Sequence, residues 1–424
     1  MRRVKVVTAS SPGWWKPDMR RAPSRWASMA SRRTLFTYER GITMTRVLVI
    51  GAGLGGLTLA HALIRAGLDV RVYEADDGTG ERAQGYRIGL APPAMEALRA
   101  GLPPRLYELA EATSSSLTGP GLLFDQRLTL LGDDLPGPEE SRAFDRQVLR
   151  QILLGDLGGR AAFGKRLKSF AEGADGTVTA LFADGTQATG DVLVGADGGS
   201  SAVRRQLVPE VELLDAGLCG VMGRTPAADR FLALVPGRGT MVKGPGITLM
   251  LGRMQFGWEP REAAAELVPG LPMPRRESYV RWVLLVPADH PAATTPGRED
   301  ARELALELID GWHPDLRDLV RDADMSSVGR SKVHDRPMPP WQVGRVTLLG
   351  DAAHLTPASG GNGAGTAMLD AVRLSARLAE VDQGRWDLIS ALHEYQHDLL
   401  ERGNAAVEAG MRAMHTFVPA VGAR

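Results

Sequence analysis

The sequence predicts an α/β fold in which a Rossmann-like dinucleotide-binding domain is interleaved with an antiparallel β-sheet domain. Three observations predict it. Residues 46–74 show the order strand, Gly-rich turn, helix, strand and terminal acid. Two later apolar strands, within 191–195 and 344–350, each end in a turn of Gly and Asp. Between them, residues 208–300 alternate turns with short apolar runs, which predict the strands of an antiparallel sheet at 218–222, 231–235, 246–251 and 279–286.

The composition excludes several classes of protein. The 424 residues are 44% hydrophobic and 24% charged, which excludes a disordered or fibrous chain. Lys and Arg number 50 and Asp and Glu number 50, so no charge excess supports a nucleic-acid-binding face. The single cysteine, Cys219, can form neither an intrachain disulfide nor a Cys-based metal site. We therefore expect no metal, no nucleic-acid partner and a cytoplasmic location.

The first 43 residues differ in charge from the rest. They hold ten Lys/Arg and two acids, a net charge of +8, so the remaining 381 residues carry −8. This Arg-rich, acid-poor composition is that of a transit peptide. The alternative, which we favour, is an over-extended start with Met44 as the initiator, because Met44 lies three residues before the first predicted strand. We exclude residues 1–43 from the fold and expect them to be poorly ordered.

An uncharged stretch of 18 residues, Val47 to Ile64, reaches the length of a membrane span. Glycines interrupt it at four positions, and a β-branched run precedes them. A strand, a turn and a helix explain this pattern better, so we predict no membrane span.

The motif Gly51-x-Gly53-x-x-Gly56 follows the first strand. The first Gly allows a tight turn, the second allows backbone to approach a pyrophosphate, and the third lets the helix close onto the strand. The helix start at Leu54 and Gly55 then presents free N–H groups and a partial positive charge to phosphate. Glu74 ends the second strand, where a carboxylate accepts hydrogen bonds from ribose hydroxyls and disfavours a 2′-phosphate. This unit predicts a dinucleotide-binding site, but it does not show whether the cofactor is FAD or NAD(P).

Two later motifs favour FAD. The turn Asp197-Gly198 follows one buried strand, and Gly350-Asp351 follows another. A Gly-rich segment, 360–365, then leads into a helix-periodic run from Ala367 to Glu380. A second helix N-terminus of this kind suits a further anionic region of one ligand, and in a flavin that region is N1–C2=O. Asp351 is placed to accept from polyol hydroxyls.

Together with Arg146-x-x-Leu149-x-x-x-Leu153, these motifs resemble the single-component FAD-dependent aromatic hydroxylases, class A monooxygenases of the p-hydroxybenzoate hydroxylase type. The resemblance covers about 47–400. It implies a Rossmann-like FAD-binding domain interleaved with an antiparallel β-sheet substrate domain. The domains it implies are 44–120 with 142–207 and 331–382 for FAD, 208–330 for the substrate sheet, and 383–424 for a C-terminal helix.

The resemblance also implies roles for single residues. The Gly51 loop would hold the pyrophosphate and Glu74 the adenosine ribose. Arg146 and Asp351 would contact the phosphate and ribityl parts, Pro357 would lie beside the isoalloxazine, and backbone near Leu167 would touch adenine. The Asp197-Gly198 turn is linked to FAD and NAD(P)H together. Relatives usually carry Asn where this chain has Gly365 and Gln where it has Asn362, so we expect backbone N–H groups of Gly363, Ala364 and Gly365 to serve the flavin instead.

In that family NAD(P)H binds transiently and reduces FAD, and dioxygen then forms a C4a-hydroperoxide that transfers one oxygen atom. The absence of a second G-x-G-x-x-G sequence fits transient NAD(P)H binding and argues against disulfide reductases. We therefore expect insertion of oxygen into an aromatic or polyketide-like small molecule. The alternatives are a halogenase, a reductase or oxidase on the same fold, and a flavin-binding protein without turnover. The halogenase segment W-x-W-x-I-P is absent from the sequence.

Several candidate substrate-site and metal-site residues have two interpretations. Met222, Met250 and Trp282 would line the substrate face of the sheet or simply form its core, and for each of them we favour the core. Trp258 and Arg253 are polar anchors or surface residues. His393 and His397 match H-E-x-x-H, which is a zinc motif or an exposed helix face, and we favour the helix face. His354 is expected to pack and hydrogen-bond near Asp351 rather than act as a base, and the sequence does not identify which residue is catalytic.

Overall fold

The computed structural model describes residues 45–78, 86–135, 140–290, 300–357 and 362–417, with side chains to residue 414. The N-terminal extension, 1–43, lies outside these residues, as do Gly360 and Gly361. The described residues belong to one compact unit.

A five-stranded parallel sheet forms the centre of the predicted dinucleotide-binding part. Its middle strands are buried along almost their whole length, as expected for parallel strands that are covered on both faces. Because all five strands run the same way, the turns that follow them meet at one edge. In sheet order the strands are β18 (Val346–Leu348), β12 (Val192–Gly195), β1 (Arg46–Ile50), β2 (Asp69–Tyr73) and β8 (Ala161–Ala162).

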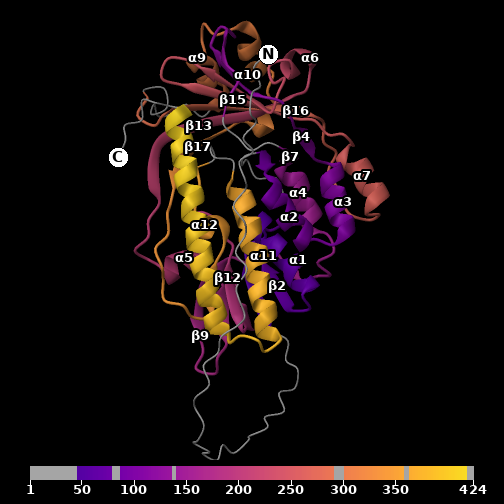
Figure 1. Ribbon diagram of the computed structural model, residues 1–424, viewed down its shortest axis with the longest axis vertical. Helices are drawn as coiled ribbons and strands as arrows, with labels where there is room; N and C mark the ends of the chain where they lie inside the picture. Colours follow the sequence, from indigo (N-terminus) through magenta and orange to yellow (C-terminus); the bar gives the residue numbers. More distant parts are fainter. Residues whose placement is uncertain (1–44, 79–85, 136–139, 291–299, 358–361, 418–424) are drawn as a thin grey trace, which may run out of the picture. The chain divides into compact units, whose positions relative to one another are not determined.

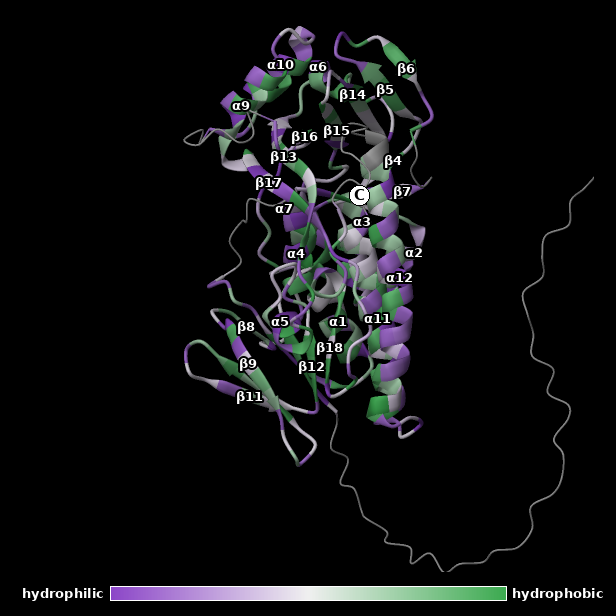
Figure 2. Ribbon diagram, turned by 90° about the vertical axis from the view of Figure 1, so that its left-hand side faces the viewer, coloured by the Kyte–Doolittle hydropathy of each residue, from purple (hydrophilic) through white to green (hydrophobic). Residues whose placement is uncertain are grey.

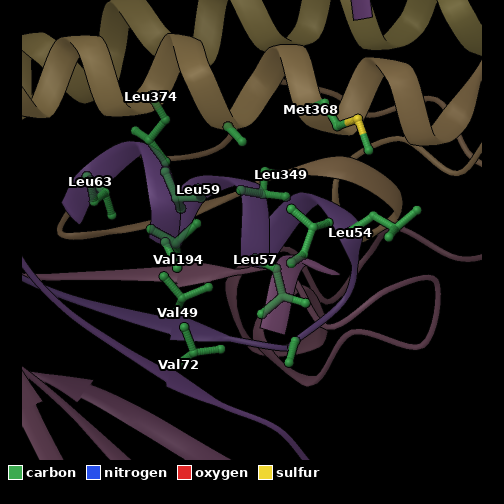
Figure 3. Packing of buried hydrophobic residues seen from close by; sticks show 14 of the residues in the cluster. Val49, Leu54, Leu57, Leu59, Leu63, Val72, Val194, Leu349, Met368 and Leu374 are labelled. Atoms are coloured by element: carbon green, nitrogen blue, oxygen red, sulfur yellow. The ribbon is translucent and has the colours of Figure 1, made fainter. Parts of the chain in front are cut away.

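Helix α1 (Leu54–Arg65) lies between this sheet and helix α11 (Gly363–Asp382), as Figure 3 shows. Leu57 and Leu59 of α1 are fully buried, and Leu374 of α11 belongs to the same core. Gly55 permits the close approach, since a Cβ there would lie 2.8 Å from Leu349 Cδ1 and 3.0 Å from Ala367 Cβ. The predicted helices at both Gly-rich segments are confirmed, and they pack directly on one another.

Shorter elements surround this core. A β3–β7–β4 sheet and a β9–β10–β11 sheet flank the parallel sheet, and helices α2, α3 and α4 pack near α1 (Figure 1). The bounds are α2 (Pro92–Gly101), α3 (Pro104–Ala112), α4 (Arg146–Leu154) and α5 (Ala202–Leu207), with β3 (Arg87–Leu90), β4 (Ser115–Leu117), β7 (Ser141–Asp145), β9 (Leu167–Glu172), β10 (Val178–Phe182) and β11 (Gln187–Gly190).

The second large sheet has seven strands, which are antiparallel except where β14 pairs with β5. Two of them, β5 and β6, come from the segment between the first two predicted FAD-binding segments. Strand β17, the last of the seven along the chain, ends at Asp335. This end lies five residues past the predicted boundary of the substrate domain at residue 330. In sheet order the strands are β17 (Gly329–Asp335), β13 (Leu214–Pro226), β16 (Tyr279–Pro287), β15 (Thr248–Met254), β14 (Gly239–Lys243), β5 (Gly121–Asp125) and β6 (Leu130–Gly132).

The two faces of this sheet have different neighbours. The outer face packs on helices α6 (Asp229–Leu232), α9 (Ala301–Leu308) and α10 (Pro314–Arg321), which lie over it in Figure 1. The inner face is defined by Tyr279, Arg281 and Val283 of β16. It meets the FAD-binding part, since the Tyr279 hydroxyl donates to Asp145 Oδ2 at 2.9 Å.

One expectation about this region is wrong, and for Trp282 the structure supports one of the two interpretations. Residues 231–235 are not a strand: Phe231 lies in the short helix α6, and Leu234 and Val235 follow in the turn after it. All three side chains are buried in the same outer core. Trp282 does not share a face with Met222 and Met250. Both methionines pair with Val283, its neighbour, and adjacent strand residues point to opposite faces. Trp282 is fully buried in the outer core, so its alternative role as sheet core is the observed one.

The C-terminal helix α12 (Leu388–Phe417) packs along α11. Figure 2 shows apolar residues, drawn in green, alternating with hydrophilic residues, drawn in purple, along α12. The Tyr395 hydroxyl of α12 donates to the carbonyl of Leu348 at the end of β18, at 3.0 Å. No helix of the described residues is long and apolar enough to cross a membrane.

Replacing Trp282 with Ala should lower the free energy of unfolding by about 3–5 kcal/mol, because a large fully buried side chain would leave a cavity. Urea unfolding would measure the loss. FAD content should stay normal, because this side chain lies on the outer face. A stable variant with altered binding of small aromatic molecules would place Trp282 on the inner face instead.

Candidate cofactor and substrate site

Four turns that the sequence singles out lie at the carboxyl edge of the parallel sheet. They follow β1 at Gly51, β2 at Glu74, β12 at Asp197 and β18 at Gly350. Because these four strands are consecutive in the sheet, segments up to 300 residues apart in sequence line one edge. This edge is where ligands bind in open α/β sheets.

The three motif glycines of the first turn serve different purposes. Gly51 has φ +110°, and a Cβ there would lie 2.4 Å from the carbonyl oxygen of Ala196. A Cβ on Gly56 would lie 2.2 Å from the carbonyl oxygen of Gly51. A Cβ on Gly53 would have no described atom within 4 Å. Gly51 and Gly56 are therefore required by packing, whereas the space at Gly53 is open to a ligand.

Glu74 is buried and holds the first turn in place. Its Oε2 accepts the N–H of Ala52 at 2.7 Å, and its Oε1 accepts the N–H of Asp76 at 3.0 Å. The carbonyl of Glu74 accepts the N–H of Lys165, which brings the start of β9, at Leu167, beside the acid. The residues predicted for the adenosine end thus lie together.

The Asp197-Gly198 turn contains a carboxylate oxygen without a partner. Asp197 Oδ2 accepts the N–H groups of Ala202 at 2.7 Å and of Val203 at 3.3 Å, which begin helix α5. Its Oδ1 is buried and has no hydrogen-bond partner among the described residues. Burial raises the pKa of Asp197, although its hydrogen bonds oppose the rise. Buried carboxylate oxygens are normally paired, so a donor of a bound ligand or an ordered water suits this position.

Asp351 lies beside the first residue of α11. A Cβ on Gly363 would be 3.6 Å from Asp351 Oδ1. Burial raises the pKa of Asp351, while the charges of Arg146, His354 and Arg336 lower it. The predicted residues Arg146, Asp351 and Gly363 are therefore close in space, although they come from α4, the turn after β18, and α11.

The start of α11 also explains the departure at Gly365. A Cβ at this position would lie 2.9 Å from Ala94 Cβ in α2, so an Asn side chain could not fit there. No side chain caps the N-terminus of α11, and none caps α1. Both helices thus leave their first N–H groups available to a ligand.

Two arginines that sequence reasoning missed connect these turns. Arg336 is fully buried: its Nη1 donates to Gly199 O at 3.0 Å and its Nη2 to Asp351 O at 2.6 Å, which joins the turns after β12 and β18. Burial, helped by Arg204, lowers its pKa to about 10. Arg150 Nε donates to Ala52 O at 2.9 Å and so ties α4 to the first turn. Arg150 stands within the Arg146 motif and could have been found there, but Arg336 follows no motif.

His354 belongs to a buried ion network. Its Nε2 lies 2.6 Å from Asp370 Oδ2, and Asp370 Oδ1 accepts both Arg402 Nε and Arg402 Nη2. Asp370 Oδ2 also accepts the N–H of Gly350 at 3.0 Å, so α11 and α12 hold the turn that carries Asp351. Burial alone lowers the pKa of His354, but the carboxylate of Asp370 raises it above its ordinary value. Gly403 leaves room for the ring, since a Cβ there would lie 2.4 Å from His354 Cδ2.

The inner face of the seven-stranded sheet is the candidate substrate surface. Met222 of β13 and Met250 of β15 are both Cα partners of Val283, so these three form an apolar floor. Pro357 lies against α12, because a Cβ on Gly410 would be 2.9 Å from Pro357 Cδ. Trp258 is 37% exposed, and Arg253 has a buried Nε without a described partner. His393 and His397 are exposed on α12, and no group of three metal-ligating side chains occurs in the described part of the chain.

These features fit FAD. The open space at Gly53, two uncapped helix starts and the unpartnered Asp197 Oδ1 lie along one sheet edge. The open space at Gly53 suits a diphosphate. The two helix starts and the Asp197 oxygen suit the polar atoms of a sugar chain and a flavin.

Comparison with known proteins agrees with the assignment of FAD as the cofactor. A family model described as an FAD binding domain matches residues 44–410. The chain is 31% identical over 87% of its length to the dual O-methyltransferase/FAD-dependent monooxygenase CTB3 of Cercospora beticola, covering 46% of that protein. It is 30% identical to the aurachin C monooxygenase/isomerase of Stigmatella aurantiaca, covering 86% of this chain and 88% of that one. HpxO of Klebsiella pneumoniae, solved with FAD and uric acid, superposes with a TM-score of 0.69 at 26% identity, covering 89% of each chain.

The chain therefore belongs to the FAD-dependent monooxygenase family of the p-hydroxybenzoate hydroxylase type. The first curated relatives are longer proteins, and this chain spans about half of their length.

Gly53→Ala should fold normally and bind FAD at least about tenfold more weakly, because its new methyl group enters only the space open to the ligand. Gly56→Ala is the matched control: its methyl group meets the Gly51 carbonyl and should cost about 1–3 kcal/mol of stability. Melting temperature and flavin fluorescence titration would separate the two. Unchanged FAD affinity in Gly53→Ala would contradict the placement of the diphosphate.

The His354–Asp370 pair predicts a loss of stability at alkaline pH. Because the folded pKa of His354 is raised, its contribution is complete below about pH 6.5 and is lost as pH rises through the folded value. Urea unfolding between pH 6 and 9 (roughly spanning that window) should show this decline, and His354→Gln should flatten it. Parallel curves for both proteins would show that His354 does not change protonation.

Proposed function

We propose that the protein is an FAD-dependent monooxygenase that uses NAD(P)H and O2 to insert one oxygen atom into an aromatic or polyketide-like small molecule. The observation that carries the proposal is the convergence of two uncapped Gly-rich helix starts, α1 and α11, at the edge where β1, β12 and β18 end. Membership of the monooxygenase family supports it.

Different sets of residues would bind different parts of FAD. The N–H groups at the start of α1, with Gly53, Leu54 and Gly55, would bind the diphosphate. Glu74 and backbone near Leu167 would hold the adenosine end, and Arg146 with Asp351 the ribityl chain. The N–H groups of Gly363, Ala364 and Gly365 would donate to the flavin pyrimidine. When bound, FAD supplies the electron transfer and the oxygen activation.

The chain's own task beyond binding is to exclude water from the reacting atoms. The floor of Met222, Met250 and Val283 offers no hydrogen-bonding side chain. Met414 of α12 packs with Leu218 and Leu285 at the same inner face, so α12 shields it. His354 is committed to Asp370 and positions the Asp351 turn, which leaves it no part in proton transfer to a substrate.

The proposed domains are those of the sequence, with β5, β6 and the end of β17 added to the substrate sheet. Names of relatives support a small planar substrate: one is an FAD-dependent urate hydroxylase and another a 6-hydroxynicotinate 3-monooxygenase. Dependence on NAD(P)H and a lone cysteine favour the cytoplasm.

The test is a product mass measured with ¹⁸O₂. The FAD-loaded protein should oxidise NAD(P)H faster when a substrate is present, and the product should gain one labelled oxygen atom. Gly53→Ala, assayed without added FAD, is the control and should lose this activity. A product changed by two hydrogens would assign a reductase or oxidase, and a chloride-dependent product would assign a halogenase. No substrate-stimulated oxidation across phenols and polyketides would leave a binding protein.

A further inference from the structure

Arginine side chains gather on the inner face of the seven-stranded sheet, next to the proposed substrate surface. Arg281 of β16 and Arg224 of β13 are Cα partners on this face. Arg87, from β3 of the FAD-binding part, reaches across to β15. Its Nε donates to Arg253 O at 2.9 Å, and its Nη1 lies 2.9 Å from where a Cβ of Gly252 would be. Gly252 is the Cα partner of Arg281, so Arg87 and Arg281 are neighbours.

Only one of these three arginines is neutralised by a carboxylate. Arg224 Nη2 lies 3.0 Å from Asp324 Oδ2, and its guanidinium stands over the ring of Tyr86 at 5.2 Å. Arg87 and Arg281 have no ion pair within the described residues. Arg87 Nη2 and Arg281 Nε are shielded from solvent and lack a hydrogen-bond partner there.

The charges of Arg87 and Arg281 are correspondingly costly. Burial, with the nearby charge of Arg281, lowers the pKa of Arg87 to about 9, and burial also lowers the pKa of Arg281. Buried donors are almost always paired in folded proteins, and a buried charge without a partner destabilises the fold. Two such cations side by side indicate that something other than stability retains them.

The carboxylate of the residue that pairs with Arg87 in the sheet is already used. Asp145 is the Cα partner of Arg87, but its Oδ2 accepts the Tyr279 hydroxyl at 2.9 Å. Its Oδ1 accepts the N–H groups of Gln147 at 3.0 Å and Val148 at 2.9 Å at the start of α4. Asp145 is therefore not available to neutralise Arg87, and an anionic group of a ligand would satisfy the two arginines.

The adjoining surface indicates what the rest of that ligand is like. Val283 is the next inner-face residue after Arg281 along β16, and it pairs with Met222 and Met250. A cationic pair thus borders an apolar floor. This combination suits an apolar ring system that carries one anionic oxygen group.

We propose that Arg87 and Arg281 form an anion-binding subsite that holds a carboxylate, or a deprotonated phenol or enol oxygen, of an otherwise apolar substrate. The ligand is called a substrate because of the proposed function, on which this part of the inference rests. Two planar guanidinium groups present several N–H donors to such an oxygen group, and they fix its orientation over the apolar floor.

The test compares two probes of nearly equal shape, 2-naphthoate and 2-naphthamide, by calorimetric titration of the FAD-loaded protein. The wild type should bind the anion at least about tenfold more tightly than the amide. Arg281→Met and Arg87→Met should each remove that preference and leave amide binding and FAD content unchanged. Arg230→Met, which removes an exposed arginine paired with Asp318 and Asp322, should behave as the wild type does.

Melting temperature supplies a second readout. If the pair serves a ligand, Arg281→Met and Arg87→Met should raise the melting temperature of the protein without probe, since each removes an uncompensated charge. A lower melting temperature in both variants would assign the arginines a structural role and overturn the proposal. A wild type without preference, or a preference that survives both substitutions, would overturn it as well.

Two further outcomes separate related ideas. Phosphate groups of NAD(P)H carry the same charge. If Arg281→Met raised the KM for NAD(P)H and kept the naphthoate preference, the pair would belong to the coenzyme and the proposal would fail. If the preference behaved as expected but no compound gained oxygen, the subsite would stand and the monooxygenase assignment would fail.

Discussion

The structure depends on backbone donors that the fold leaves without partners. Helices α1 and α11 both begin at the carboxyl edge of the parallel sheet, and neither has a side-chain cap. Each start therefore presents N–H groups and a positive dipole end to the same region. The near-contact of Gly55 with Ala367 and Leu349 fixes the distance between the two starts, so a single elongated anionic ligand can bridge them. The charged residues around this edge serve to hold those two starts in place.

That support is buried and electrostatic. Arg336 joins the turns after β12 and β18 through their carbonyl groups, and Asp370 joins the turn after β18 to α11 and α12. Breaking a buried ion network removes several kcal/mol, whereas such a network contributes little net stability when intact. The main effect of this network is to fix the positions of Asp351 and Gly363. The inner face of the seven-stranded sheet differs from this network. There Arg87 and Arg281 are buried, and no carboxylate of the described residues pairs with them.

Much of this arrangement could be predicted from the sequence, because its motifs are local. Gly51, Gly53 and Gly56 with Glu74 form one continuous unit, and the helices around Arg146 and after Gly363 follow from their periodicity. Long-range features could not be predicted. Arg336 and Asp370 follow no motif, and the face on which Trp282 lies depends on strand register, which the sequence does not show. The prediction of a strand at 231–235 fails because a short apolar run fits both the helical and the strand periodicity.

The central claim is that α1 and α11 hold the two ends of one FAD molecule. A crystal structure of the FAD-loaded protein tests it most directly. The account predicts the diphosphate within hydrogen-bond distance of the Leu54 and Gly55 N–H groups, with the flavin pyrimidine at the start of α11 beside Gly363. A flavin that lay away from α11, or a diphosphate away from the space at Gly53, would contradict it.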